Sequence, residues 1–157
     1  MKPLTKIIIA LAIPAIIVII LVVMISYSNT PKNNNSNNTT TMNTIQEGLT
    51  YLTLTEPDPN APMVEVGDKL VVNYEGKLTD GTIFDSSFDR GTPFDLQIGV
   101  GQVIQGWDKG LIGMRKGEVR ELTIAPELGY GSRGSGADIP PNATLIFKVE
   151  IVDIVKE

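Results

Sequence analysis

The chain of 157 residues contains no cysteine and no histidine. Without cysteine it has no disulfide, no thiol nucleophile, no thiolate metal ligand and no site for a cysteine-linked lipid. Without histidine it lacks the most frequent general base and the most frequent metal ligand of proteins. Aspartate and glutamate bind hard cations in some proteins, but the spacing of an EF-hand loop does not occur here. Serine–histidine hydrolysis and most zinc chemistry are therefore excluded, and we expect neither a metal site nor a cofactor.

Acidic residues are absent from the N-terminal part, since all 18 of them lie at or after Glu47. The part from Thr44 onward also contains ten lysines and arginines, so its net charge is −8. No basic stripe of the kind that binds nucleic acid is present, and neither is the phosphate-binding pattern G-x-x-x-x-G-K-S/T. We therefore expect no nucleic-acid partner, and we attribute the acidic balance to solubility.

The first 25 residues form the most apolar part of the chain. Lys2 and Lys6 give a short positive start, and Ile7–Ile25 then runs for 19 residues without a charge. A helix of that length spans roughly 28 Å, close to the hydrocarbon thickness of a bilayer. Pro14 is tolerated in such a helix. Residues 1–25 therefore predict a membrane anchor, with the lysines in the cytoplasm and the rest of the chain across the membrane.

A cleaved signal peptide is the alternative, because Ser26-Tyr27-Ser28 is a small-x-small triplet that a signal peptidase accepts. Signal cores usually run for about 7–15 residues, so the longer apolar run favours a retained anchor or an uncleaved signal. A buried core helix fits 19 consecutive apolar residues poorly.

Residues 26–43 have the composition of a tether. Fourteen of these 18 residues are Asn, Ser or Thr, which offer too little apolar surface to offset the entropy of ordering. Three N-glycosylation sequons begin there, at Asn34, Asn37 and Asn38, although asparagine-rich stretches form sequons by chance. A further sequon at Asn142 enters a predicted strand, which argues against glycosylation at that position.

Residues 44–157 have the pattern of one compact domain. Alternation of apolar and polar residues predicts strands at Leu70–Leu78, Phe94–Ile98, Leu122–Ile124 and Leu145–Ile151. The turn dipeptide Asp80-Gly81 returns the chain into another strand that begins at Ile83. Residues 105–112 predict a short helix that Gly113 ends. Many short strands with one small helix indicate an antiparallel α+β fold.

Five motifs follow one another between Gly67 and Val155. They are Val72–Gly76 (VNYEG), Gly81–Ser87 (GTIFDSS), Val103–Trp107 (VIQGW), Pro126–Gly131 (PELGYG) and Ile139–Phe147 (IPPNATLIF). Their order and spacing resemble the domain of the FKBP-type peptidyl-prolyl cis-trans isomerases. The resemblance implies a five- to six-stranded antiparallel sheet curled around one short helix, with a pocket between them. It also implies an isomerase that acts on proline-containing polypeptides, and we expect a monomer.

The same resemblance implies which residues form the pocket. Ten side chains are expected to line it: Tyr74, Phe84, Asp85, Phe94, Val103, Ile104, Trp107, Tyr130, Ile139 and Phe147. Trp107 is expected at the floor, and the Ile104 N–H and Tyr130 hydroxyl are expected to donate to the bound peptide. Asp85 is expected to accept hydrogen bonds at the wall. Asp85, Tyr130, Phe84 and Ile104 are thus the expected catalytic residues, and the other six are expected to bind substrate.

Pattern alone gives these residues simpler roles. Aromatic rings on strands are usually core residues, which is the alternative for Phe84, Phe94 and Phe147. Asp85 lies between two turn-like stretches, and on pattern alone it caps a turn. The resemblance favours the pocket over both alternatives, because the family builds its pocket from the matching positions.

The chain departs from the family pattern in the loop Ser132–Ile139. Ser135 stands where several well-known members have a histidine, and Asp138 stands where they have an apolar residue. We expect this loop to overhang the pocket and Asp138 to place a carboxylate at its rim. Such a charge would disfavour acidic residues next to the substrate proline and favour basic ones.

Three functions remain open from the sequence. The first is an isomerase that assists the folding of proteins on the outer side of the membrane, without covalent chemistry. The second is a membrane-tethered chaperone, or a module that binds proline segments and has incidental isomerase activity. The third is a purely structural membrane-tethered domain, against which the complete ring set with Asp85 and Tyr130 argues.

Overall fold

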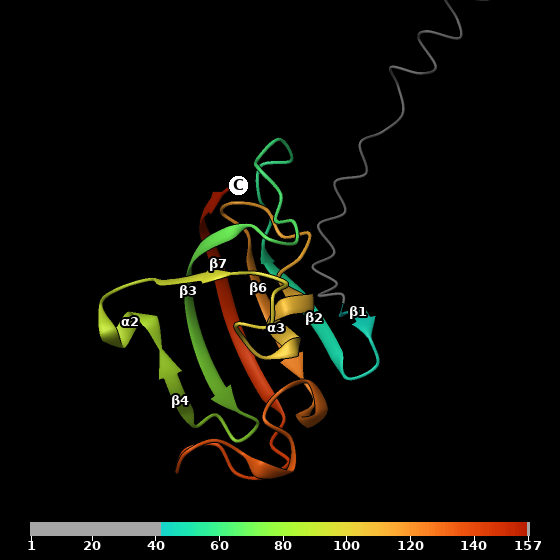
Figure 1. The fold of residues 1–157 in the computed structure, drawn as a ribbon, viewed down its shortest axis with the longest axis vertical. Coiled ribbons are helices and arrows are strands. Elements are labelled where there is room, and N and C mark those ends of the chain that lie inside the picture. Colours follow the sequence, from blue (N-terminus) through green and yellow to red (C-terminus); the bar gives the residue numbers. More distant parts are fainter. Residues whose placement is uncertain (1–41, 157) are drawn as a thin grey trace, which may run out of the picture. The chain divides into compact units, whose positions relative to one another are not determined.

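The computed structural model describes residues 42–156 (Figure 1). The membrane helix predicted over residues 1–25, and nearly all of the predicted tether, lie outside this range. Among residues 42–156, no helix combines the length and the apolar character needed to cross a bilayer.

Seven antiparallel strands form one sheet, in the order β1-β2-β6-β7-β3-β4, with β5 also paired to β3. Their bounds are β1 Asn43–Gln46, β2 Leu49–Thr55, β3 Lys69–Leu78, β4 Ile83–Ser86, β5 Phe94–Gln97, β6 Val119–Ile124 and β7 Leu145–Val155. The sequence predicted β3 to β7 but not β1 and β2. The count exceeds the expected five or six because β1 and β2 extend the sheet beyond β6. Strands β4 and β5 share one edge of β3, β5 pairing with residues 69–72 and β4 with residues 75–77.

The two long strands β3 and β7 form the centre of the sheet. They pair along their whole length, from Lys69 opposite Val155 to Leu78 opposite Leu145. Successive side chains of a strand point to opposite faces, so every second residue can enter the core. The buried side chains on these two strands follow that alternation: Leu70, Val72, Tyr74, Leu145, Phe147, Val149 and Ile151. The alternation read from the sequence therefore identified the core face of both strands.

Helix α3 (Gln105–Gly110) crosses in front of the strands in Figure 1 and packs against β2 and β6. It ends two residues earlier than predicted, and Gly113 adopts a left-handed φ of 79° just after it. A Cβ on Gly106 would lie 2.5 Å from the Ile124 side chain, and one on Gly110 would lie 2.9 Å from Leu122. Both distances are too short for a real contact, so the two glycines allow the helix to approach the sheet.

A buried ion pair fixes the far end of α3. Arg120 of β6 donates to Glu118 at 2.7 and 2.9 Å and to the Gly110 carbonyl at 2.9 Å. Its guanidinium lies over the Tyr51 ring of β2, 3.9 Å from the ring centre. A buried charge is tolerated only when it is paired and hydrogen-bonded, and Arg120 meets both conditions. One side chain therefore links β2, β6 and the last carbonyl of α3.

Three shorter helices complete the described domain: α2 (Ser87–Arg90) and two 3₁₀ turns, η1 (Pro126–Leu128) and η2 (Gly131–Arg133). The Ser86 hydroxyl caps α2 by accepting from the N–H groups of Phe88 and Asp89, at 3.2 and 3.4 Å. Gly91 ends α2 in the left-handed conformation that favours glycine. This cap turns the chain between β4 and β5 so that both strands can reach β3.

Replacement of Gly76 by alanine is expected to disturb both the sheet and the rings packed on it. Gly76 pairs with Phe147, and a Cβ there would lie 2.6 Å from the Phe84 ring and 2.7 Å from the Phe147 ring. Overpacking of this kind costs about 1–3 kcal/mol. Urea unfolding of Gly76→Ala should show a loss of that size. Lys77→Ala is the control, since it removes only a surface ion pair to Glu121 and should cost less than about 1 kcal/mol. Equal stability of the two variants would contradict the close packing at Gly76.

Candidate active site

A pocket of about 670 Å³ brings together all ten residues that the sequence assigned to it. Three residues of the loop Ser132–Ile139, which was expected to overhang the pocket, also line it, and Gln102 is the one further residue in the lining. The full lining is Tyr74, Phe84, Asp85, Phe94, Gln102, Val103, Ile104, Trp107, Tyr130, Ser135, Gly136, Asp138, Ile139 and Phe147. These residues come from β3, β4, β5, β7, α3 and the connecting loops, so the pocket depends on the whole domain being folded.

Trp107 is the central ring of the pocket and is only 4% exposed. The rings of Tyr74 and Phe147 meet it edge to face, with ring centres 5.1 and 5.2 Å away, and Phe94 lies at 6.3 Å. Edge-to-face pairs at such distances are favourable beyond the area they bury. The Trp107 indole N–H has no hydrogen-bond partner within the described domain. Ring contacts, rather than a hydrogen bond, therefore hold Trp107 in place.

Phe84 extends this cluster from β4. Its ring meets Phe147 edge to face at 5.4 Å. The rings of Phe84, Phe94, Trp107 and Phe147 thus give the pocket an apolar surface that the sheet and α3 hold from several sides. Such a surface suits an apolar ring such as the pyrrolidine of proline.

Asp85 belongs to a group of polar side chains at the wall of the pocket. Its carboxylate accepts hydrogen bonds from the Tyr74 hydroxyl and from the Arg90 guanidinium. Arg90 also donates to the Tyr74 hydroxyl oxygen at 2.8 Å, and its guanidinium lies 5.2 Å from the centre of the Tyr74 ring. Burial and the neighbouring Asp85 raise the pKa of Tyr74, although Arg90 opposes this. The Tyr74 hydroxyl therefore stays protonated at neutral pH and donates to Asp85.

Arg90 was missed by the sequence reasoning. It lies five residues after Asp85, at the last residue of the short helix α2, and no regular spacing links the two positions. Only the α2 turn, which ends at Gly91, brings Arg90 back to Asp85.

Tyr130 stands at the opening of the pocket and is 39% exposed. Burial and the charge of Asp85 raise the pKa of its hydroxyl, which therefore stays protonated well above neutral pH. No residue of the described domain makes a hydrogen bond with this hydroxyl. The expected role of this hydroxyl as a donor to bound peptide stays a prediction, with which the lack of a partner is compatible.

Ile104 precedes α3 with an extended backbone, φ −60° and ψ 150°. Its carbonyl accepts from the N–H groups of Trp107 and Asp108, at 2.9 and 3.1 Å, so it begins the helix. The N–H of a residue at this position has no partner inside the helix. The Ile104 N–H is therefore available as a donor beside the pocket.

The loop that leads to Ile104 is held by Asp108. The two carboxylate oxygens of Asp108 accept from the N–H groups of Gly99 and Gly101, each at 2.8 Å. Both glycines have left-handed φ angles, of 77° and 76°. Gln102 adds a further bond, since its side-chain oxygen accepts from the Gln97 N–H at 2.6 Å. The contacts of Asp108 with Gly99 and Gly101 were not predicted from the sequence, because an aspartate in the first turn of a helix is common.

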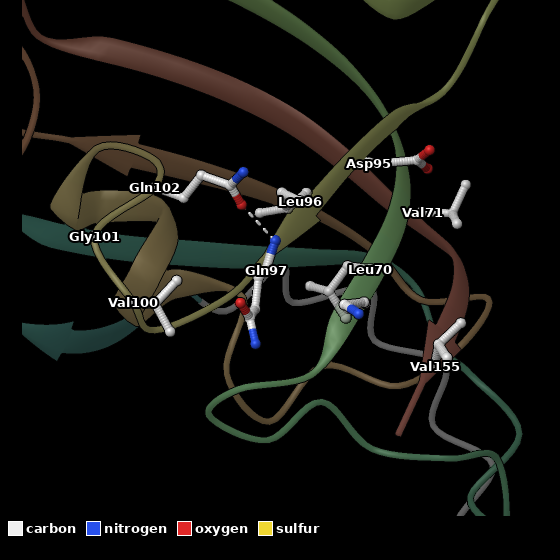
Figure 2. A pocket seen from close by; sticks show the side chains of 10 residues that line it. Leu70, Val71, Asp95, Leu96, Gln97, Val100, Gly101, Gln102 and Val155 are labelled. Atoms are coloured by element: carbon white, nitrogen blue, oxygen red, sulfur yellow. Dashed lines mark hydrogen bonds between the residues drawn. The ribbon is translucent and has the colours of Figure 1, made fainter. Parts of the chain in front are cut away.

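A second hollow, of about 690 Å³ (Figure 2), shares Gln102 but no other lining residue with this pocket. Figure 2 shows Val71, Asp95 and Val155 on neighbouring strands and Val100 and Gly101 on the loop. None of the ten expected pocket residues lines it. It contains no aromatic ring, and we do not assign it to the active site.

Residues 61–152 match the family model of the FKBP-type peptidyl-prolyl cis-trans isomerases. The chain belongs to this family. "FK506-binding protein 2" of Dictyostelium discoideum is 52% identical over 110 residues, which are 70% of this chain and 80% of that protein. "Peptidyl-prolyl cis-trans isomerase FKBP15-1" of Arabidopsis thaliana is 58% identical over 88 residues, 56% of this chain and 58% of that protein. The crystal structure of AtFKBP13 has a TM-score of 0.67 and 35% identity, and the match covers 73% of this chain and 99% of that one.

Membership confirms the family that the five motifs indicated and makes the chain an FKBP-type peptidyl-prolyl cis-trans isomerase. Domains of this family bind proline-containing polypeptides. The antiparallel sheet with short helices is the fold of the matched structure.

Removal of the Asp108 clamp is expected to lower isomerase activity without changing the pocket rings. Asp108→Ala frees Gly99 and Gly101, and the Ile104 N–H then loses its fixed position. We expect kcat/KM to fall about threefold to tenfold, equivalent to about 0.7–1.4 kcal/mol of lost transition-state stabilisation. Asp108→Asn keeps one acceptor oxygen, so its kcat/KM should lie between those of the wild type and Asp108→Ala. Lys109→Ala, on the same helix but exposed, is the control. Unchanged activity of Asp108→Ala in a folded protein would show that the clamp has no positioning role.

Proposed function

We propose that this FKBP-type domain isomerises X–Pro bonds by holding the amide in its twisted geometry, without a covalent step, on proteins that fold at the outer side of a membrane. The observation that supports the chemical part is the pocket itself. It combines four apolar rings with two donors, the Ile104 N–H and the Tyr130 hydroxyl.

The apolar surface favours the twisted state for an electrostatic reason. Amide resonance opposes rotation with a barrier near 18–20 kcal/mol, and an uncatalysed X–Pro bond takes tens to hundreds of seconds to isomerise. At the twisted state the C–N bond loses its double-bond character, and the amide becomes less dipolar. Transfer from water to the ring-lined pocket therefore costs the twisted amide less than the planar one. That difference lowers the barrier.

The donors add selectivity for the twisted geometry. The Ile104 N–H is fixed by the start of α3, and the Tyr130 hydroxyl keeps its proton because its pKa is raised. A donor that fits only the twisted peptide stabilises that state alone. One such interaction of about 3 kcal/mol corresponds to roughly a hundredfold in rate.

Asp85 acts on the wall of the pocket through its partners. Its contacts with Tyr74 and Arg90 hold the Tyr74 ring edge against Trp107. In this proposal Asp85 contributes mainly by keeping the rings in place, and it accepts from the substrate only at its remaining lone pairs. No residue in the pocket has to gain or lose a proton, which suits a chain without histidine.

The proposed location rests on the sequence of residues 1–25. A positive start followed by 19 uncharged residues supports a single-pass anchor with the N-terminus in the cytoplasm. The Asn/Thr/Ser-rich residues that follow would allow the domain to reach chains that emerge near the membrane. The client polypeptides would then be proteins in the course of folding outside the cytoplasm.

A chaperone or proline-binding module is the second candidate, and exposed apolar side chains support it. Ile83 is 52% exposed on β4, the strand that contains Phe84 and Asp85, and Phe88 is 56% exposed on the adjoining helix α2. Unfolded clients present apolar segments that such side chains contact. This role uses the same pocket and differs from the first in needing no rate enhancement.

Two phenylalanine variants distinguish these functions. Phe84→Ala removes a pocket ring and is expected to lower kcat/KM by at least about tenfold, because the apolar surface around the amide is opened to water. Phe88→Ala removes an exposed ring outside the pocket and is the matched control. Cis–trans exchange of a tetrapeptide, followed by NMR, gives the rates. A wild-type rate no higher than that of Phe84→Ala would favour the binding module.

The same assay tests whether the isomerisation rate depends on the protonation of a pocket residue. Because the pKa values of Tyr74 and Tyr130 are raised, kcat/KM of the wild type should stay flat between pH 6 and pH 9. A steep loss over this range would mean that a titrating group takes part in the reaction.

The anchor has a simple test. We expect the full chain to remain in the membrane fraction after alkaline extraction, and a chain without residues 1–25 to be released. A retained anchor gives the mobility of the full chain on a gel, whereas cleavage near Ser28 gives a shorter product. Digestion of the domain by protease added outside intact cells or spheroplasts would support the proposed side, and full protection would contradict it.

A further inference from the structure

Asp138 places an unbalanced negative charge at the rim of the isomerase pocket. Its side chain lines the pocket and is exposed to solvent. Within residues 42–156 it forms neither a hydrogen bond nor an ion pair. No partner in this range therefore offsets a charge on the carboxylate.

The only other acidic residue in the lining has its charge offset. Asp85 forms an ion pair with Arg90 and also accepts from Tyr74. Arg90 donates to both Asp85 and Tyr74, so its positive charge is already paired. No lysine or arginine belongs to the pocket lining. The net field at the rim is consequently negative, and Asp138 is its source.

The loop that carries Asp138 is braced, so the charge has a fixed place. The N–H of Ser135 donates to the Ile139 carbonyl at 2.9 Å, and the N–H of Ile139 donates to the Ser135 carbonyl at 3.1 Å. A Cβ on Gly134 would lie 2.3 Å from the Ile139 carbonyl oxygen, so the loop closes against this glycine. Ile139, directly after Asp138, is buried among the core residues. Asp138 is thus held between a tight bridge and a core contact.

A fixed rim charge acts on the residues that flank the substrate proline. In the proposed function the proline ring fills the apolar part of the pocket, which places the neighbouring substrate side chains at its edge. Exposed ion pairs contribute about 0.2–1 kcal/mol each. This corresponds to about 1.4-fold to fivefold in kcat/KM for each charge on the substrate.

We infer that Asp138 is a specificity-determining residue, which makes this isomerase prefer proline flanked by lysine or arginine over proline flanked by aspartate or glutamate. The inference rests on the proposed assignment of this pocket as the site of isomerisation. It concerns the choice among substrates and not the rotation of the bond itself.

The test compares peptides that differ in a single residue. Ala-Lys-Pro-Phe, Ala-Gln-Pro-Phe and Ala-Glu-Pro-Phe vary the residue before proline, and a second set varies the residue after it. Cis–trans exchange rates are measured by NMR with the full chain in a neutral detergent. The glutamine peptide is the reference within each protein, so a general change in activity cancels.

Three variants distinguish an effect of the Asp138 charge on substrate preference from an effect of the protein's net charge. Asp138→Asn should bring the lysine-to-glutamate ratio close to one, and Asp138→Lys should invert it. Glu127→Gln removes the same charge from an exposed position outside the pocket lining and should leave the ratio of the wild type. In wild type we expect a ratio of about 2 to 25 at low salt, falling toward one in 1 M salt as the Debye length drops to about 3 Å.

The outcomes are distinguishable. A preference for lysine that Asp138→Asn abolishes and Glu127→Gln retains would support the inference, at whichever side of proline it occurs. Acceleration of all peptides with the same ranking in wild type and Asp138→Lys would overturn it while leaving the isomerase pocket intact. An equal loss of preference in Glu127→Gln would also overturn it, in favour of net charge. No acceleration of any peptide by folded protein would remove the proposed pocket function, and this inference with it.

Discussion

Helix α3 can lie against the sheet only because two of its six residues have no side chain on the face that meets β6. Gly106 and Gly110 leave room for Ile124 and Leu122, and a single methyl group at either place would push the helix away. Trp107 lies between these two glycines in the sequence. The close approach of the helix therefore places the Trp107 ring where the rings of Tyr74 and Phe147 meet it edge to face. The floor of the pocket is therefore set by helix-to-sheet distance. Arg120 keeps that distance at the other end of the helix by holding the Gly110 carbonyl.

A similar constraint shapes the opposite wall. Gly76 pairs with Phe147 across β3 and β7, and its missing Cβ gives space to the Phe84 and Phe147 rings. The polar group of Tyr74, Asp85 and Arg90 stands beside these rings and links β3 to β4 and α2. The rings are thus fixed by backbone approach, and the polar wall is fixed by side-chain bonds. An apolar pocket of this kind holds its shape before substrate arrives, which is what a mechanism based on preorganisation needs.

How far the sequence predicts this structure depends on how local each signal is. Strand β7 and the core face of β3 were predictable because their alternation is long and regular. Strand β2 was missed because its three threonines resemble the polar stretch before it, and its burial comes from pairing with the distant β6. The split edge formed by β4 and β5 depends on the α2 turn. Arg90 and Asp108 were missed for the same reason: each acts through contacts that a loop geometry creates, and no spacing in the sequence encodes them.

The ten pocket residues were predictable for a different reason, since the resemblance carried them over and periodicity did not. Pattern alone placed Phe84, Phe94 and Phe147 in the core, and the structure shows why that reading was half correct. Phe147 is buried in the core cluster, while Phe84 and Phe94 are only partly buried against it. The pocket wall is continuous with the hydrophobic core, so the same ring stabilises the fold and forms the site. A substitution in the ring cluster should therefore affect stability and activity together, whereas the rim charge of Asp138 lies outside the core and can change without this cost. If Asp138 sets substrate choice as inferred, that choice is the property of this site that can vary most freely.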